Sequence, residues 1–221
     1  MSTESSLDAS SDASDKDAVV LVHGIWMNGL MMSFLAKQLN KRGFDSVTIS
    51  YRSLKKAPAE NAERVHELIK KLPNKRVHLV GHSLGGIVIL HLLDRYDDIP
   101  DGRVVLMGSP VRGSAFARQL AANRWSSLLL GRSVDAGVLG GAPVYQDKRE
   151  LGIIRGTIRL GAAALVRKPG ETNDGVVSES ETMISGANDY TDLPLSHSML
   201  IFSRRSANLV AHFLNHGCFS Q

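Results

Sequence analysis

The chain has 221 residues, of which 43% are hydrophobic and 22% are charged, and its formal net charge is +4. This composition is typical of a soluble globular protein with one domain. The basic pairs at 70–71 and 204–205 are typical of solvated helix faces, so no nucleic-acid partner is indicated. Cys218 is the only cysteine, which excludes an intrachain disulfide and gives no sign of a thiolate metal site.

Residues 1–17 are rich in Ser, Asp and Ala. They contain no basic segment followed by an apolar one, as a signal peptide would. Their composition predicts a disordered leader, followed by a folded domain over residues 18–221. No apolar run approaches the length of a membrane span. These features favour a cytoplasmic protein.

Strand-like and helix-like segments alternate along the domain. We predict strands at residues 18–22, 46–51, 76–80, 103–107 and 151–160, with a short last strand at 182–184. We predict helices at residues 30–42, 59–72, 86–93 and 202–215. This alternation indicates an α/β fold, with a mostly parallel sheet flanked by helices and right-handed crossovers. Sites in such sheets lie at the carboxyl ends of the strands.

Residues 113–149 break this rhythm and are predicted to form a helical insertion over the sheet edge. One interpretation is a structural crossover whose apolar residues are buried. The other is a lid or acyl-binding wall, and the candidate substrate-binding residues are then Trp26, Trp125, Leu128, Leu129 and Leu130.

The segment from Gly81 to Gly85 fits the pattern G-x-S-x-G, between a strand-like run and an apolar helix-length run. Strand, tight glycine turn and helix form the context of a nucleophile elbow, which predicts Ser83 as a nucleophile. The alternative is a glycine-rich turn with an ordinary serine. His82 is expected to shape this turn rather than to perform chemistry.

A serine nucleophile needs an adjacent base, and His197 is the strongest candidate among the histidines. It lies in a loop between the predicted last strand and the last helix, where it completes the chain order Ser, Asp or Glu, His. The remaining histidines are expected to have packing or surface roles, apart from His23, which belongs to another motif.

The acid that orients the histidine is predicted to be Asp174, in an Asn-Asp-Gly turn soon after the strand at 151–160. Gly175 permits a tight turn that aims the carboxylate inward. Asp189 and Asp192, near the histidine loop, are the second choices, and Asp135 in the insertion is the third.

Acyl transfer also needs donors for the developing oxyanion. One is expected to be the backbone N–H of Leu84, the residue after the nucleophile. The other is expected from the loop after the first strand, with Ile25 as the first choice and Trp26 as the reserve.

The ordered set of motifs resembles the α/β-hydrolase superfamily, specifically its small bacterial lipases and esterases. The residues that carry the resemblance are His23–Ile25, Gly81–Gly86, Gly108–Ser114, Asn173–Val177 and Ser196–His197. The resemblance implies a sheet without the first two strands of the usual fold. It also implies a serine hydrolase that cleaves small-molecule or lipid esters of carboxylic acids through an acyl-enzyme, with neither a metal nor an organic cofactor.

Three other interpretations stay open. A thioesterase or an amidase would use the same triad. A binding protein would have kept the fold without catalysis. A lipid hydrolase at a membrane surface would make transient contact through Trp125 and Leu128–Leu130. The oligomeric state is not indicated.

Overall fold

Six parallel strands form one sheet in the computed structural model, which describes residues 15–122, 124–146, 148–160 and 170–219. Most of the predicted leader, residues 1–14, lies outside the described residues. The strands are β1 (Ala18–Val22), β2 (Asp45–Ile49), β3 (Val77–His82), β4 (Val104–Met107), β5 (Leu151–Gly156) and β6 (Asp189–Leu193). Their order across the sheet is β2-β1-β3-β4-β5-β6, which confirms the predicted mostly parallel sheet.

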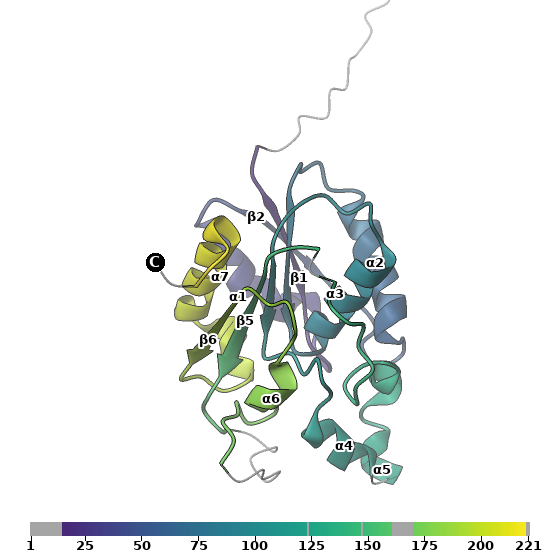
Figure 1. Cartoon of the computed structure of the whole chain (residues 1–221). Helices are drawn as coiled ribbons and strands as arrows, with labels where there is room; N and C mark the ends of the chain where they lie inside the picture. The colour runs from purple at the N-terminus through teal and green to yellow at the C-terminus, as the bar shows by residue number, and fades with distance from the viewer. Residues whose placement is uncertain (1–14, 123, 147, 161–169, 220–221) are drawn as a thin grey trace, which may run out of the picture.

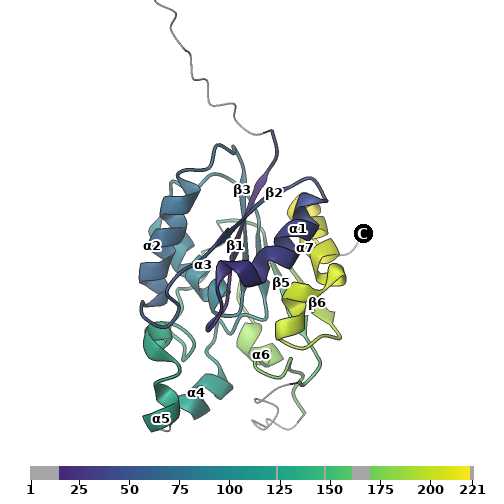
Figure 2. The same ribbon diagram turned by 180° about the vertical axis from the view of Figure 1, so that it is seen from behind.

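The helices lie on both faces of this sheet (Figures 1 and 2). The longer ones are α1 (Ser33–Asn40), α2 (Pro58–Ile69), α3 (Leu84–Arg95) and α7 (Arg204–His216). Helices α2 and α3 cover one face, and α1 and α7 cover the other. Flanking helices on both faces confirm the predicted α/β fold class. Within the described ranges, each helix is too short or too polar to cross a membrane.

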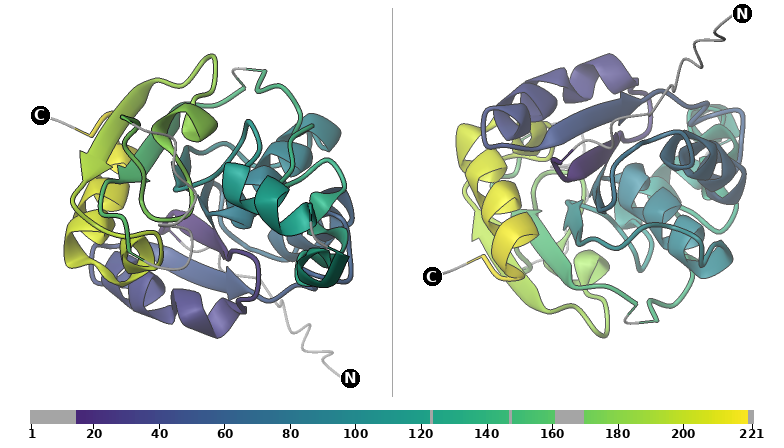
Figure 3. Two further views of the ribbon diagram at one scale, coloured as in Figure 1. Left: turned by 90° about the horizontal axis from the view of Figure 1, so that it is seen from below. Right: turned by 90° about the horizontal axis from the view of Figure 1, so that it is seen from above.

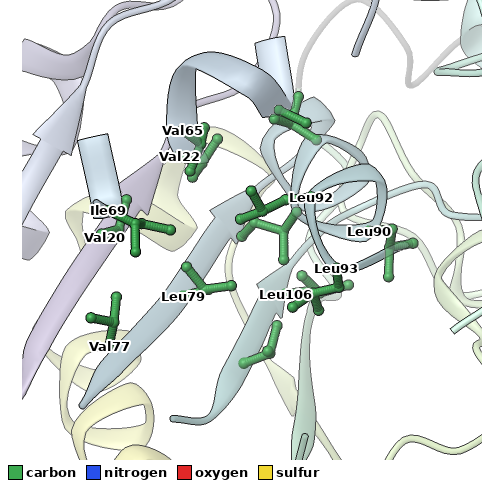
Figure 4. Packing of buried hydrophobic residues seen from close by; sticks show 14 of the residues in the cluster. Val20, Val22, Val65, Ile69, Val77, Leu79, Leu90, Leu92, Leu93 and Leu106 are labelled. Carbon is green, nitrogen blue, oxygen red and sulfur yellow. The ribbon is translucent and has the colours of Figure 1, made fainter. Parts of the chain in front are cut away.

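The continuous apolar run of β1 explains why this strand is central. It pairs with β2 on one side and with β3 on the other, and all five of its residues are buried. Val20 and Val22 contribute to the cluster under α2 and α3, whereas Val19 and Leu21 contribute to the cluster under α1 and α7. Because side chains alternate along a strand, an all-apolar strand fits only where both faces are covered. Figure 4 shows the first cluster, where Val65 and Ile69 of α2 face the sheet.

The predicted last strand at 182–184 is wrong. Thr182 ends the short helix α6 (Glu179–Thr182), which begins with a capping box between Ser178 and Glu181. The last strand is β6 (Asp189–Leu193), which among the described strands pairs only with β5. An edge strand has one neighbour and a solvated side, so its polar sequence does not resemble that of a buried strand.

Short helices and loops gather beyond the carboxyl ends of the strands, as the left view of Figure 3 shows end-on. Those of the insertion are α4 (Ala115–Ala121), α5 (Arg124–Ser127) and the 3-10 turn η2 (Gly131–Val134). Two further 3-10 turns are η1 (Gly29–Met32) and η4 (Ser198–Phe202). The loops that follow β1, β3 and β5 meet at this end, which therefore holds the candidate site.

The α7 face offers a direct test of the core. Phe213 is fully buried, and its ring packs so close to the backbone of Gly152 that a Cβ there would lie 2.7 Å from the ring. We expect Phe213→Ala to lower the free energy of unfolding by about 3–5 kcal/mol, because it removes buried apolar contacts and leaves a cavity. Urea titration measures this change. The control Val144→Ala, at an 81% exposed position, should stay within about 0.5 kcal/mol of the parent, and an equal loss in both variants would contradict the assignment.

Candidate active site

Ser83 occupies the sharp turn between β3 and α3, with φ 54° and ψ −123°. A non-glycine residue in this left-handed region costs of the order of 1–3 kcal/mol and persists only where its surroundings enforce it. The Ser83 N–H donates to the Met107 carbonyl at 2.9 Å, which holds the turn against the end of β4. The hydroxyl group therefore stands at the carboxyl edge of the sheet.

The glycines of the motif allow this turn because the backbones around it nearly touch. A Cβ on Gly85 would lie 2.1 Å from the Val22 carbonyl oxygen at the end of β1. A Cβ on Gly81 would lie 2.6 Å from the Gly86 nitrogen. Neither contact can be relieved by rotating a side chain, so only glycine fits at these two positions.

Asp174 and His197 are hydrogen-bonded, with 2.6 Å between Oδ2 and Nδ1. The other carboxylate oxygen of Asp174 accepts from the backbone N–H groups of Val176 at 2.9 Å and Val177 at 2.8 Å. The backbone N–H of His197 donates to the backbone carbonyl of Asp174 at 2.9 Å. Since a carboxylate accepts at Nδ1–H, this bond favours the tautomer in which Nε2 is an acceptor.

The alternative acids contact other partners. Asp192 pairs with Arg155 at 2.6 Å. Asp189 accepts from the Phe219 N–H at 2.7 Å, and Asp135 accepts from Arg132 at 3.1 Å. Asp174 is the acid that the structure places against His197.

Ser83 and His197 both line one pocket of about 250 Å³. Its wall consists of Gly24, Ile25, Trp26, Met27, Met31, His82, Ser83, Phe116, Val176, His197, Ser198, Ile201 and Phe202. Most of the wall is apolar, and it comes from the loop after β1, from α4 and from η4. Met27, Phe116 and Ile201 were not expected in this wall, because nothing in their local sequence indicates that they face the same space.

The insertion contributes to this wall less than expected. Trp26 lines the pocket, but Leu130 is buried in a cluster with Leu84. Trp125, Leu128 and Leu129 are exposed by 81%, 72% and 54% and lie outside the pocket lining. The reason is geometric, since α5 is a single short helix of four residues, none of which is buried.

The two expected oxyanion donors come from two segments: Leu84 belongs to the elbow, and Ile25 to the loop after β1. Leu84 is the first residue of α3, where backbone N–H groups lack intrahelical acceptors. Ile25 lines the pocket and packs against the same cluster as Leu84. The arrangement can present two N–H groups to a developing negative charge.

His23 and Tyr51 support the loop that carries Ile25. Their rings stack with centroids 4.1 Å apart, and the Tyr51 hydroxyl donates to the His23 carbonyl. His23 Nδ1–H donates to the Gly24 carbonyl at 2.7 Å. Burial lowers the pKa of His23, so this histidine serves as a neutral support. In the part of the chain that the structure describes, no group of three or more His, Cys, Asp or Glu side chains could hold a metal ion.

Solved structures share this fold. A lipase from Bacillus licheniformis (BlEst2, mature form) is 22% identical, with a TM-score of 0.71 over 91% of this chain and 92% of that chain. An esterase from Exiguobacterium antarcticum (EaEST) is 17% identical, with a TM-score of 0.61 over 90% of this chain and 92% of the other. At these identities the likeness concerns the fold alone.

A curated relative is similar over a shorter stretch. The putative carbamate hydrolase RutD of Pantoea ananatis (strain LMG 20103) is 42% identical over 75 residues, which are 34% of this chain and 26% of that protein. The model of the Alpha/beta hydrolase family matches residues 19–205, which include the elbow, the acid turn and the histidine loop. The chain therefore belongs to the alpha/beta hydrolase family.

Proposed function

We propose that this protein is a serine hydrolase that cleaves carboxylic esters through an acyl-enzyme intermediate. The observation that carries the proposal is the shared pocket of Ser83 and His197, with Asp174 bonded behind the imidazole at 2.6 Å. A strained serine, a histidine whose Nδ1 is bonded to a carboxylate, and a carboxylate that is itself buried are the parts that acyl transfer requires.

In the proposed reaction, Ser83 Oγ attacks the ester carbonyl while His197 Nε2 takes the hydroxyl proton. The carbonyl oxygen becomes an oxyanion, which the N–H groups of Ile25 and Leu84 stabilise. The carbon–oxygen bond to the alcohol then breaks, and His197 returns the proton to the leaving alcohol. Water attacks the acyl-enzyme by the same steps and releases the acid. Asp174 holds the imidazole and stabilises its charged form throughout.

The pocket contains a second histidine, His82, which is unsuited to be the base. It is almost fully buried, and its Nε2–H donates to the His197 carbonyl at 3.0 Å. Burial, together with the nearby His197, lowers the pKa of His82 to about 3. A group with so low a pKa holds a proton too weakly to act as a general base near neutral pH. His82 instead helps to position the loop of His197.

The apolar wall supports esters with an apolar acyl or alcohol group. Phe116, Ile201 and Phe202 line the pocket beside Ser83. Each methylene that such a wall removes from water contributes about 0.8 kcal/mol. The volume of about 250 Å³ favours a small or medium-sized group over a long chain that is enclosed completely.

A carbamate or amide is the second candidate substrate, because the curated relative is named a putative carbamate hydrolase. The same triad would serve, since only the leaving group differs. A panel of p-nitrophenyl esters, an aryl carbamate and an anilide distinguishes the two. Higher kcat/KM for the esters supports the first proposal, and higher kcat/KM for the carbamate or anilide supports the second.

Ser83→Ala tests the nucleophile. We expect kcat to fall by about a million-fold, as in other triad enzymes, with the fold retained. Ester turnover measures the loss, and a fluorophosphonate probe should label the parent but not the variant. The control Ser180→Ala changes an exposed serine of α6 and should keep both activities. Parent-like turnover by Ser83→Ala would refute the assignment.

Asp174→Asn tests the acid. We expect kcat to fall by about ten-thousand-fold, because an amide at this position favours the wrong imidazole tautomer. Circular dichroism should be unchanged. Asp189→Asn and Asp192→Asn are the matched controls and should retain most of the activity. If Asp174→Asn keeps its activity and one of the two controls loses it, the acid is the residue changed in that control, Asp189 or Asp192.

The lowered pKa of His82 predicts that the free energy of unfolding depends on pH. Its pKa is about 3 in the folded protein, against 6.5 for an unperturbed histidine, so unfolding takes up a proton between these values. The stability from neutral His82 is therefore present above pH 6.5 and is lost as the pH falls toward 3.

Urea titrations at several pH values measure this effect. His82→Gln keeps a donor for the His197 carbonyl but cannot titrate. We expect its free energy of unfolding to fall less steeply below pH 6.5, by up to about 1.4 kcal/mol per pH unit. Because burial also lowers the pKa of His23, His78 and His91, the difference between the two proteins is the relevant quantity. Equal slopes would contradict the burial of a neutral His82.

A further inference from the structure

Trp26 joins two segments that are far apart in the sequence. It directly follows Ile25 in the loop of residues 23–26, which we call the oxyanion loop. Its indole Nε1–H donates to the Leu129 carbonyl at 2.7 Å, 103 positions later in the chain. Leu129 lies between α5 and η2 of the insertion. The indole therefore connects the insertion directly to the segment that carries a proposed oxyanion donor.

The backbone at Trp26 is in an unfavourable conformation for its side chain. Its φ is 59°, in the left-handed region where glycine and asparagine are far more common than tryptophan. Among the described residues, only Ser83 and Ala136 are other non-glycine residues with positive φ. Such strain persists only where the surrounding contacts enforce it, which favours a functional or structural role for this large side chain.

The buried side of the insertion reinforces the same connection. Leu130 is 2% exposed and packs in a cluster with Leu84, and Ile25 packs against this cluster. The insertion thus shares one apolar cluster with both residues whose N–H groups serve the proposed reaction. On its other side, the Arg132 N–H donates to the Leu54 carbonyl at 2.9 Å, which anchors η2 to the domain.

We propose that Trp26 is a positioning residue that couples the insertion to the oxyanion loop. Its indole N–H holds the loop so that the Ile25 N–H points to the developing charge. This inference rests on the proposed esterase function and goes beyond it, because it gives the insertion a role in turnover. A donor used in the transition state affects kcat more than substrate binding. The coupling should therefore appear in kcat.

The test removes only the indole N–H. Replacing Trp26 by 3-benzothienylalanine puts sulfur in place of the N–H and keeps the bicyclic ring. Trp26→Phe is a genetically encoded second variant, which loses the N–H together with part of the ring. We expect kcat for a short ester to fall about tenfold, equal to about 1.4 kcal/mol, with KM within about twofold. Ser127→Ala is the matched control, because it removes an insertion hydrogen bond, to the Arg124 carbonyl at 2.8 Å, that does not reach the oxyanion loop. Its kcat should not change.

A second measurement does not depend on turnover. Arg124 and Arg132 are exposed residues of the insertion, and limited trypsin digestion there reports how firmly it is held. We expect faster cleavage in both Trp26 variants than in the parent and in Ser127→Ala.

The outcomes separate the two proposals. An unchanged kcat, a rise in KM alone or unchanged cleavage would each overturn the coupling. A rise in KM alone would mean that Trp26 only contacts the substrate as part of the pocket wall. If the parent neither hydrolyses esters nor labels with fluorophosphonate, the proposed function fails, and the cleavage rates still decide whether the indole holds the insertion.

Discussion

The close approach of backbones at the β3–α3 turn is the constraint on which the rest of the site depends. The turn brings α3 against the end of β1, so that a Cβ at Gly85 would overlap the Val22 carbonyl. It also forces Ser83 to positive φ. The strain is compensated by the hydrogen bond to β4 and by the apolar packing of α3, whose residues from Leu84 to Leu93 are all buried. A rigid core on both sides thus keeps one serine in a conformation that it would not adopt alone.

Burial sets the electrostatic behaviour of the groups around this serine. Asp174 is 1% exposed, yet its carboxylate oxygens accept from His197, Val176 and Val177. A buried carboxylate without such donors would be costly. His82 lacks comparable compensation, and its Nδ1 has no partner among the described residues, which agrees with a neutral ring. Two histidines in one pocket therefore have different surroundings, and such differences set roles apart in sites that combine several titratable groups.

The insertion has two faces with different surroundings. One face carries Leu130 into the core and connects to the oxyanion loop through Trp26. The other leaves Trp125 and Leu128 exposed, beyond the carboxyl ends of the strands. A short helix cannot both pack on the domain and close over the pocket with the same residues, which explains why the pocket wall comes mainly from other segments.

Several features could be predicted from the sequence because they depend on local physics. The all-apolar β1 indicates a central strand, and alternating strands and helices indicate a parallel sheet. The glycines around Ser83 indicate a tight turn, and the chain order of Ser83, Asp174 and His197 is the one expected of the proposed triad.

Other features depend on contacts that local sequence does not encode. The polar strand β6 is stable because β5 pairs with it and because Arg155 pairs with Asp192, so it could not be distinguished from a loop. The choice of Asp174 over Asp189 depends on which carboxylate the fold brings to Nδ1 of His197. The pocket wall joins residues from distant segments. The sequence itself thus determined the apolar central strands, the flanking helices and the tight turn at Ser83, because these follow from neighbouring residues. The polar edge strand and the partners of each side chain were decided only when the sheet brought distant segments together.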